Sequence, residues 1–309
     1  MVVVRRIAMG LAIAVAIATV LGFIGTLFWA FDLIANFRLQ LAVVALGVAL
    51  VLIAARRPGV GAAMVVVALL NAAVIAPLYL RSPQPSDGGD TLSLVSFNIQ
   101  LSNPQRQLDW ILESDPDIVF LFESSRLAED VLADMDLPYE IFSAIDDDRQ
   151  YGPTALVRPG MSASKLPYSN EGGGAVRVGT TLDGQPVAVY GIHAPSPGTP
   201  MRAEARDRFL ERSGRAVEDE SIPVVVAGDL NTTPFTHGFE LLTAPAELVN
   251  SQEGFGYTPT WPAQLPAVLR IPLDHVLHTA DLTVLERVLG PRLSSDHLPV
   301  RAEIGFAVR

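Results

Sequence analysis

The chain has 309 residues, a hydrophobic fraction of 50%, a formal net charge of −11 and no cysteine. The absence of cysteine excludes disulfide bonds and thiolate metal sites. The acidic balance makes nucleic acid a less favoured partner, because proteins that bind it usually display a basic surface. The apolar residues are concentrated in residues 1–80, so the first question is whether this part spans a membrane.

Three apolar runs follow one another near the N-terminus: Ile7–Ala30, Leu39–Ala55 and Gly59–Leu80. None contains a charged residue. A helix needs roughly 20 apolar residues to cross the hydrocarbon core of a bilayer. A cleaved signal peptide is the alternative for the first run, but its apolar core has only about 7–15 residues. The pattern therefore predicts a transmembrane domain of three helices in residues 1–80.

The arginines around these runs predict the orientation of the chain. The pairs Arg5–Arg6 and Arg56–Arg57 fall on one side of a three-span arrangement, whereas the single residues Arg38 and Arg81 fall on the other. Cytoplasmic flanks carry the excess of Lys and Arg. We therefore expect a multi-pass protein of the cell (plasma) membrane, with the membrane lipid bilayer as a partner and the rest of the chain outside the cytoplasm.

Two further segments follow the apolar part. Residues 81–90 are rich in Pro, Gly and Ser and are predicted to be a linker. Residues 91–309 form the predicted globular domain, which is long enough to bury a core of its own. Beyond residue 81, 16 Lys and Arg stand against 32 Asp and Glu, a formal charge of −16. This charge further disfavours a polynucleotide substrate.

Short apolar, β-branched runs recur in the globular domain, each bounded by Gly, Pro, Asp or Ser, as strands usually are. The predicted strands are Leu92–Ile99, Asp117–Glu123, Thr154–Val157, Val187–His193, Pro223–Asp229, Leu273–His278 and Leu298–Ile304. The predicted helices between them are Gln105–Glu113, Arg126–Met135 and Met201–Glu218. Because strands outnumber helices and alternate with them unevenly, the pattern favours an α+β sandwich over a doubly wound parallel sheet.

Polar residues of one chemical kind lie at or near the ends of the predicted strands. They are Asn98, Glu123, His193, Asp229, Asp274 and His297. A single polar residue in such a place is usually a turn or a cap. Six residues suited to holding a metal or a phosphate group indicate one shared site at the rim of a sheet.

The strongest signal is Gly228-Asp229-Leu230-Asn231, directly after the apolar strand Val224–Val226. Gly228 lets the backbone turn closely. Asp229 and Asn231 point the same way if the extended conformation continues. Asp229 can accept a proton or orient a water molecule, and Asn231 can donate to a phosphate oxygen. The alternative is an ordinary turn after a strand.

A second signal is the adjacent pair Asp296 and His297, which leads into the last strand. Neighbours on a strand face opposite sides, so one irregular residue is needed for both to reach the same pocket. Asp274 is placed to fix the tautomer of His297 and to stabilise its protonated form. The alternative for the pair is a surface loop. His275 and His278 are predicted to be ordinary strand residues.

Weaker signals lie at three other strand ends. Glu123 ends an apolar strand, and carboxylate oxygens are the ligands that Mg²⁺ prefers. The amide of Asn98 can bind phosphate or a metal-bound water, and His193 ends the strand that contains Tyr190-Gly191-Ile192. Each of these three residues, taken singly, is also explained by an ordinary strand end.

The order of short motifs along the chain resembles one known family. The motifs are SFN ending at Asn98, FE ending at Glu123, GIH ending at His193, GDLN ending at Asn231, LDH ending at His275 and SDH ending at His297. In this order they resemble the endonuclease/exonuclease/phosphatase (DNase-I-like) superfamily, over about residues 91–306. The resemblance implies a two-sheet sandwich flanked by helices and a metal-dependent phosphoesterase.

The resemblance also implies metal ligands. Glu123 would be the main ligand of Mg²⁺ (or Mn²⁺), with Asn98 and Asp296 beside it. Two residues near these ligands depart from the family pattern. Ile99–Gln100 follow the first Asn where many members have a charged residue, and Phe122 precedes the Glu where many have Gln.

The same resemblance implies the catalytic groups. Asp229 and Asn231 would activate water and hold the phosphate, His193 and His297 would stabilise its oxygens, and Asp274 would pair with His297. Preorganised donors of this kind stabilise the charge that develops in the transition state. Whether Asp229 or the Asp274–His297 pair is the general base stays open at this point.

The expected function is hydrolysis of phosphate esters at the outer membrane surface, with lipid-linked or headgroup phosphates as the favoured substrates. Three spans joined to such a domain also resemble membrane proteins associated with glycopeptide resistance. A membrane-tethered extracytoplasmic nuclease is the alternative, and a few nuclease members use a Tyr for which Tyr151 is the candidate here. An inactive sensor or scaffold is the third reading. The sequence leaves the oligomeric state open.

Overall fold

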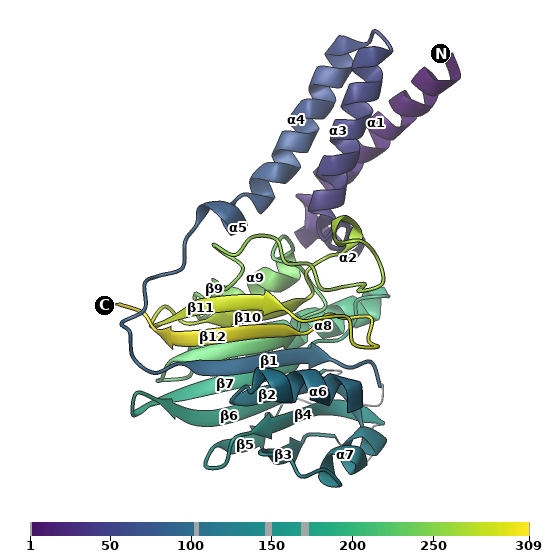
Figure 1. Cartoon of the computed structure of the whole chain (residues 1–309). Helices are drawn as coiled ribbons and strands as arrows, with labels where there is room; N and C mark the ends of the chain where they lie inside the picture. Colours follow the sequence, from purple (N-terminus) through teal and green to yellow (C-terminus); the bar gives the residue numbers. More distant parts are fainter. Residues whose placement is uncertain (1, 102–104, 146–149, 168–172, 309) are drawn as a thin grey trace.

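The computed structural model describes residues 2–101, 105–145, 150–167 and 173–308 (Figure 1). Three long helices form an N-terminal bundle that projects from a layered domain of two sheets. They are α1 (Val2–Gly22), α3 (Arg38–Ala54) and α4 (Pro58–Ile75). Small buried residues such as Ala12, Ala45 and Ala49 lie between them. Small side chains let helix backbones approach closely where the surroundings are apolar.

The bundle contains two helices, α1 and α4, that are long and apolar enough to cross a membrane. Helix α3 passes the same test only together with α2 (Trp29–Ala35), from which it is separated by a bend of 69°. The described residues therefore offer two candidate spans, or three if the bent pair counts as one. The prediction of three separate spans is not established by the structure.

The first apolar run differs from its prediction, because its helix ends at Gly22 instead of continuing to Ala30. The guanidinium of Arg38 donates to the carbonyl oxygen of Gly22 at 2.5 Å and to that of Thr19 at 3.3 Å. Carbonyl groups at the end of a helix lack partners within the helix, and a cation there satisfies them. The chain then leaves the bundle through the short helices η1 (Gly25–Leu27) and α2.

Two six-stranded sheets form the sandwich in the described residues after the bundle. The first has the order β11 (Leu282–Leu289), β12 (Val300–Phe306), β1 (Leu92–Asn98), β2 (Ile118–Ser125), β4 (Tyr151–Val157) and β3 (Glu140–Ser143). The second has the order β5 (Ser162–Lys165), β6 (Gly174–Leu182), β7 (Gln185–His193), β8 (Val224–Asp229), β10 (Asp274–His278) and β9 (Val249–Asn250). The pairs β1–β2 and β7–β8 are parallel and the other pairs are antiparallel. Both sheets are therefore mixed, as the α+β class requires.

The main core lies between the two sheets. Phe120 of β2 faces Gly191 of β7, where an added Cβ atom would lie 2.2 Å from the Phe120 ring. Helices cover the outer faces: α6 (Gln105–Ser114) and α7 (Arg126–Ala133) on the first sheet, α8 (Pro200–Glu218) and α9 (His237–Thr243) on the second. This is the helix-flanked sandwich that the sequence predicts.

Five strands and one α-helix in the described part of the sandwich escape the sequence patterns. They are β3, β5, β6, β9, β11 and α9. β3 and β5 are short edge strands with exposed polar residues, and β9 has only two residues. In β11, two consecutive exposed residues, Leu285 and Glu286, interrupt the alternation at a register shift. The alternation of apolar and polar residues, on which strand prediction depends, is therefore lost.

The predicted linker, residues 81–90, is tied to the sandwich. The backbone N–H of Asp87 donates to Phe306 O at 3.1 Å, and Ser86 forms an isolated bridge with Ala307. Arg81 also pairs with Glu253 at 2.7 Å. The segment therefore follows the end of β12 instead of crossing freely between bundle and sandwich.

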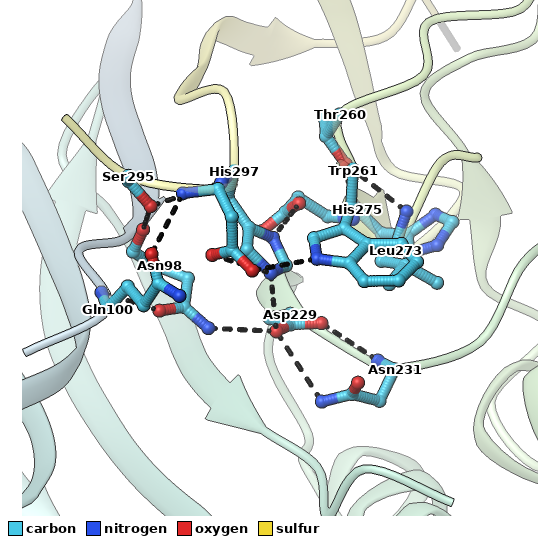
Figure 2. A network of polar contacts seen from close by, with 12 residues as sticks. Asn98, Gln100, Asp229, Asn231, Thr260, Trp261, Leu273, His275, Ser295 and His297 are labelled. Carbon is cyan, nitrogen blue, oxygen red and sulfur yellow. Dashed lines mark hydrogen bonds and ion pairs between the residues drawn. The ribbon is translucent and has the colours of Figure 1, made fainter. Parts of the chain in front are cut away.

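The topology brings distant strand ends to one edge of the sandwich. β1 and β2 run parallel, so their carboxyl ends lie together, and the same holds for β7 and β8. β10 is antiparallel to β8, and its first residue, Asp274, stands opposite Asp229. β12 is antiparallel to β1, so the loop before Val300 reaches the same edge. Figure 2 shows Asn98 at the end of β1, Asp229 at the end of β8 and His297 in the loop before β12 close together there.

Candidate active site

A pocket of about 910 Å³ opens at this edge. Its wall includes six of the eight predicted site residues: Glu123, His193, Asp229, Asn231, Asp296 and His297. If these groups share one cleft, their side chains must lie within a few ångströms of one another. The distances between individual atoms test this hypothesis.

One amide connects two acidic side chains. Nδ2 of Asn98 donates to Oε1 of Glu123 at 3.1 Å and to Oδ2 of Asp229 at 3.0 Å. The Asn98 oxygen accepts from the backbone N–H of Gln100 at 3.0 Å. Asn98 is 1% exposed, so its amide is locked in place. It holds the two carboxylates side by side at the pocket wall.

Local backbone geometry aims these groups into the pocket. Glu123 has φ of +52°, at a register shift between β2 and β4, and Asn231 has φ of +49°. Left-handed conformations at residues other than glycine cost free energy and concentrate at functional sites. A Cβ atom at Gly228 would lie 1.8 Å from Ile192 O, so only glycine lets β8 approach β7 this closely.

His297 and Asp274 form a buried pair. Nδ1 of His297 lies 2.8 Å from Oδ2 of Asp274, and its Nε2 lies 3.7 Å from Oδ2 of Asp229. Burial lowers the pKa of His297, but the neighbouring carboxylates of Asp274 and Asp229 outweigh it and raise the pKa to about 10. The imidazole is therefore a cation at neutral pH, with Nδ1–H directed at Asp274 and Nε2–H free to donate into the pocket.

His193 and Asn231 complete the ring of donors. Nε2 of His193 lies 3.7 Å from both Oε1 of Glu123 and Oδ2 of Asp229. The backbone N–H of Asn231 donates to Oδ1 of Asp229 at 2.9 Å, and its side-chain amide donates to Ala194 O at 2.9 Å. Both residues border the acidic centre and also line the pocket.

Asp296 lies at the rim. Its Oδ2 accepts from the indole N–H of Trp261 at 2.9 Å, and its Oδ1 lies 4.0 Å from Nε2 of His297. Ser294, two residues earlier, has φ of +58° and supplies the irregular backbone that lets Asp296 and His297 line the same pocket. Their assigned functions stay predictions, but their placement matches the geometry that the motif requires.

Several supporting residues escaped the sequence analysis. Ser295 Oγ donates to Asn98 O at 2.6 Å and accepts from His297 N at 3.0 Å, so it ties the last loop to β1. Gln100 accepts from Asp296 N at 3.2 Å. Such contacts join chain segments almost 200 residues apart, so no local sequence pattern indicates them. Tyr151 lies on the pocket wall beside Gly152 and is 44% exposed.

His275 and His278 do not line this pocket. Nε2 of His275 donates to Thr232 O at 2.9 Å, and its Nδ1 accepts from Gln252 at 3.3 Å. Burial lowers the pKa of His275 to about 4, which keeps the ring neutral. His278 contacts the carbonyl oxygen of Thr279. Their contacts are those of the ordinary strand residues that were predicted.

The side chains present suit a hard divalent cation. Glu123, Asp229 and Asp296 offer carboxylate oxygens to one pocket, with the Asn98 amide between the first two. Mg²⁺ and Mn²⁺ prefer oxygen ligands of this kind. In the described chain, single atoms of Asp229, Asp274 and His297 also lie within 4.8 Å of one another. Asp274 is fully buried and does not line the pocket, whereas Glu123 does, so Glu123 is the better anchor.

One wall of the pocket comes from an unexpected part of the chain. Leu33, Asn36 and Phe37 line it, although they belong to α2 and the turn before α3. Asn36 is buried, and its Oδ1 accepts from Thr233 N at 3.0 Å. The segment between two apolar helices therefore contributes directly to the pocket.

A ring of carboxylate, amide and imidazole groups at the edge of a two-sheet α+β sandwich is typical of enzymes that hydrolyse phosphate esters. The sequence model of the endonuclease/exonuclease/phosphatase family matches residues 95–297, and the chain belongs to this family. Its members are hydrolases that act on phosphodiesters or phosphate esters. Among curated proteins, none matches this chain.

Solved structures share the fold at low sequence identity. D. rerio TDP2 in complex with a single-strand DNA product has a TM-score of 0.58 at 18% identity, covering 70% of this chain and 99% of that one. An endonuclease/exonuclease/phosphatase protein from Beutenbergia cavernae has a TM-score of 0.51 at 23% identity, covering 70% and 72%. A protein of this family from Bacteroides thetaiotaomicron has a TM-score of 0.54 at 14% identity, covering 72% and 100%.

Proposed function

We propose that the chain is a divalent-metal-dependent phosphoesterase that hydrolyses lipid-linked or headgroup phosphates at the outer surface of the cell membrane. The observation that carries this proposal is the composition of the pocket. The pocket is lined both by acidic and imidazole side chains and by residues that lie between two apolar helices. A site built in this way is held close to the membrane if the bundle is embedded in it.

Residues 1–80 would then form the membrane domain, 81–90 the connection and 91–309 the catalytic domain. Several backbone and side-chain hydrogen bonds join the bundle end to the sandwich; two of them run from Gln40 to Arg270 O at 2.9 Å and from Gly254 N to Leu78 O at 2.9 Å. The linker therefore is not the main determinant of where the site lies. The bundle itself is docked on the catalytic domain.

The chemistry assigned to each side chain follows from its contacts. His297 is protonated, so it cannot accept the proton of an attacking water, and Asp229 is the better general base. As the water oxygen bonds to phosphorus, one water proton passes to Asp229, the bond between phosphorus and the ester oxygen breaks, and the leaving oxygen takes up a proton from solvent and departs as the alcohol. His297, His193 and Asn231 donate to the phosphate oxygens, and Asp274 keeps His297 oriented and charged.

The cation would be held by Glu123, with Asn98 and Asp296 as further candidate ligands. When bound, a divalent ion neutralises phosphate oxygens and lowers the pKa of water. Two carboxylates fixed to one amide repel each other, and this repulsion favours binding of a cation between or beside them.

A screen for phosphate release tests the proposal. The purified full chain with Mg²⁺ is given polyprenyl phosphates, phospholipids, sugar phosphates and nucleotides. We expect release from a lipid substrate by the wild type and its loss in His297→Gln. His278→Gln is the matched control, because this buried histidine lies away from the pocket. Absence of release from every phosphate ester would refute the proposal.

A nuclease is the second candidate, since a structure with the same fold contains a single-strand DNA product. The formal charge of −16 beyond residue 81 opposes it, because phosphate backbones bind to cationic surfaces. Plasmid nicking and single-strand digestion distinguish the two functions. Nicking that Asp229→Asn abolishes, without lipid phosphate release, would establish the nuclease.

A further inference from the structure

We infer that α2 and the turn after it form the substrate-specificity wall of the pocket, with Leu33 and Phe37 in contact with a long hydrocarbon chain attached to the phosphate. This inference rests on the proposed function and deepens it. It assigns a binding role to a segment that lies mostly between two of the predicted apolar runs, Ile7–Ala30 and Leu39–Ala55. Three independent features of the segment support it.

The first feature is the way α2 is fixed to the catalytic domain. Oδ2 of Asp32 pairs with Nη2 of Arg206 at 2.8 Å, with side-chain exposures of 5% and 1%. Oδ1 of Asp32 accepts from the backbone N–H of His237 at 2.7 Å, and Asn36 accepts from Thr233 N at 3.0 Å. These contacts fix the segment to Arg206 and to Thr233 and His237, which follow Asn231 in the chain.

The second feature is what this docking presents to the pocket. Leu33 and Phe37 lie on the pocket wall, and Phe37 is 43% exposed. The polar residues of the segment, Asp32 and Asn36, are buried against the protein. In a helix that faces only water the reverse arrangement is expected. The apolar side is thus left for an apolar part of the substrate.

The third feature is the continuity of apolar surface. Trp261, Ile271 and Leu273 line the same pocket as Leu33 and Phe37, and Gln40, three residues after Phe37, donates to the carbonyl oxygen of Arg270 beside Ile271 at 2.9 Å. Phe37 is followed directly by α3, whose outward residues are apolar. A phosphate at His297 with its hydrocarbon chain along this surface would remove apolar area from water on both partners. The substrate class is therefore a phosphate ester of a long-chain alcohol.

The test compares two phosphate esters that differ only in chain length, dodecyl phosphate and ethyl phosphate. The purified full chain is assayed with Mg²⁺ in detergent below and above its micelle concentration, and kcat/KM is measured for each ester. We expect Leu33→Ala combined with Phe37→Ala to lower the ratio of long-chain to short-chain kcat/KM about tenfold. The single variant Phe37→Leu keeps an apolar contact, so its ratio of long-chain to short-chain kcat/KM should stay close to that of the wild type.

Matched controls lie directly before α2. Leu27 and Phe28 are 75% and 49% exposed and do not line the pocket. Leu27→Ala combined with Phe28→Ala should keep the wild-type ratio and the wild-type unfolding temperature. A fall in this control as large as in the Leu33 and Phe37 variant would overturn the inference, because apolar exposure in general would then explain the effect.

The remaining outcomes are also decisive. Equal loss of activity on both esters in the Leu33 and Phe37 variant would give α2 a structural role only and overturn the inference, while the proposed function stands. An unchanged ratio would do the same. If the wild type hydrolyses neither ester nor any other phosphate, the proposed function itself fails. These results are distinguishable in one experiment.

Discussion

At the residue scale, the charge of His297 is the property on which the proposed chemistry depends. Asp274 lies 2.8 Å from Nδ1 and Asp229 lies 3.7 Å from Nε2, and the net result is a pKa raised to about 10. A histidine held as a cation donates hydrogen bonds and does not act as a base. This separates its role from that of Asp229, whose Oδ2 lies 3.7 Å from Nε2 of His297.

Asp274→Asn should therefore reduce kcat roughly a hundredfold. Removing the carboxylate lowers the pKa of His297, so the protonated form is lost at a lower pH than in the wild type. Activity that needs this form is present below the pKa and falls as pH rises through it. The alkaline limb of the profile of kcat against pH should move to lower pH.

The control for this prediction is Asp281→Asn, because Asp281 is an exposed carboxylate outside the pocket. Its pH profile should coincide with that of the wild type. An alkaline limb that stays in place in Asp274→Asn would show that His297 is not the group that titrates.

Glu123 is the residue at which metal dependence should be most visible. Chelation by EDTA should abolish phosphate release, and added Mg²⁺ or Mn²⁺ should restore it. Glu123→Gln removes the charge that anchors the cation and should weaken metal affinity about tenfold or more, as measured by calorimetry. The exposed Glu140 supplies the control Glu140→Gln. Equal metal affinity in wild type and Glu123→Gln would remove Glu123 from the ligand set.

At the element scale, α2 shows how a short helix acquires its position. Its seven residues are too few for a stable helix in isolation. The buried Asp32–Arg206 pair and the bond to the backbone of His237 supply the missing stabilisation. Arg206 also contacts Asp207 at 2.7 Å, so it keeps one acidic partner if Asp32 is removed.

Asp32→Asn should lower the free energy of unfolding by about 3 kcal/mol, near the lower end expected for breaking a buried ion pair, because Asp207 remains. Residues 29–37 should also lose protection in amide hydrogen exchange. Glu204→Gln, which removes the exposed partner of Arg208, is the control and should have almost no effect. Unchanged protection of residues 29–37 in Asp32→Asn would contradict the docking.

The strands show which elements sequence can reveal. β1, β2, β7, β8 and β10 are buried and apolar, and each matches a predicted run to within two residues. These are also the strands that end at the site. Edge strands such as β3 and β5 lack a buried face to impose alternation, so their patterns are too weak to recognise.

At the scale of the whole molecule, the positions of the bundle and the sandwich bear on the proposed orientation of the chain in the membrane. Arg57 lies in the turn between α3 and α4, at the far end of the bundle, and the sandwich lies at the other end (Figure 1). If the bundle is embedded in a membrane with the sandwich outside, Arg57 faces the cytoplasm. The excess of arginine at this turn agrees with that orientation.

The absence of cysteine makes the orientation easy to measure. Asp219→Cys and Arg57→Cys each introduce a single exposed thiol. In intact cells a membrane-impermeant maleimide should label Asp219→Cys fully and Arg57→Cys only after permeabilisation. The wild type is the unlabelled control. The opposite labelling pattern would place the sandwich in the cytoplasm, and labelling of both in intact cells would argue against a span between them.

The sequence by itself determined the chemical groups and their order. Asn98, Glu123, Asp229 and His297 follow apolar runs, and residue type and local periodicity are properties that a linear pattern carries directly. It also located the apolar helices, because a long run without charge admits few other structures. The sandwich class followed from the uneven spacing of strands.

Only the tertiary structure decided which groups touch and what encloses them. Asp32 and Arg206 are 174 residues apart, and Asn98 and Asp229 are 131 apart. Read along the chain, Asp32 is a single charge within an apolar segment, and nothing nearby indicates its partner. Contacts at such separations depend on how whole layers pack, because packing selects among many partners that are locally equivalent. The protonated state of His297 and the apolar wall of the pocket both arise in this way.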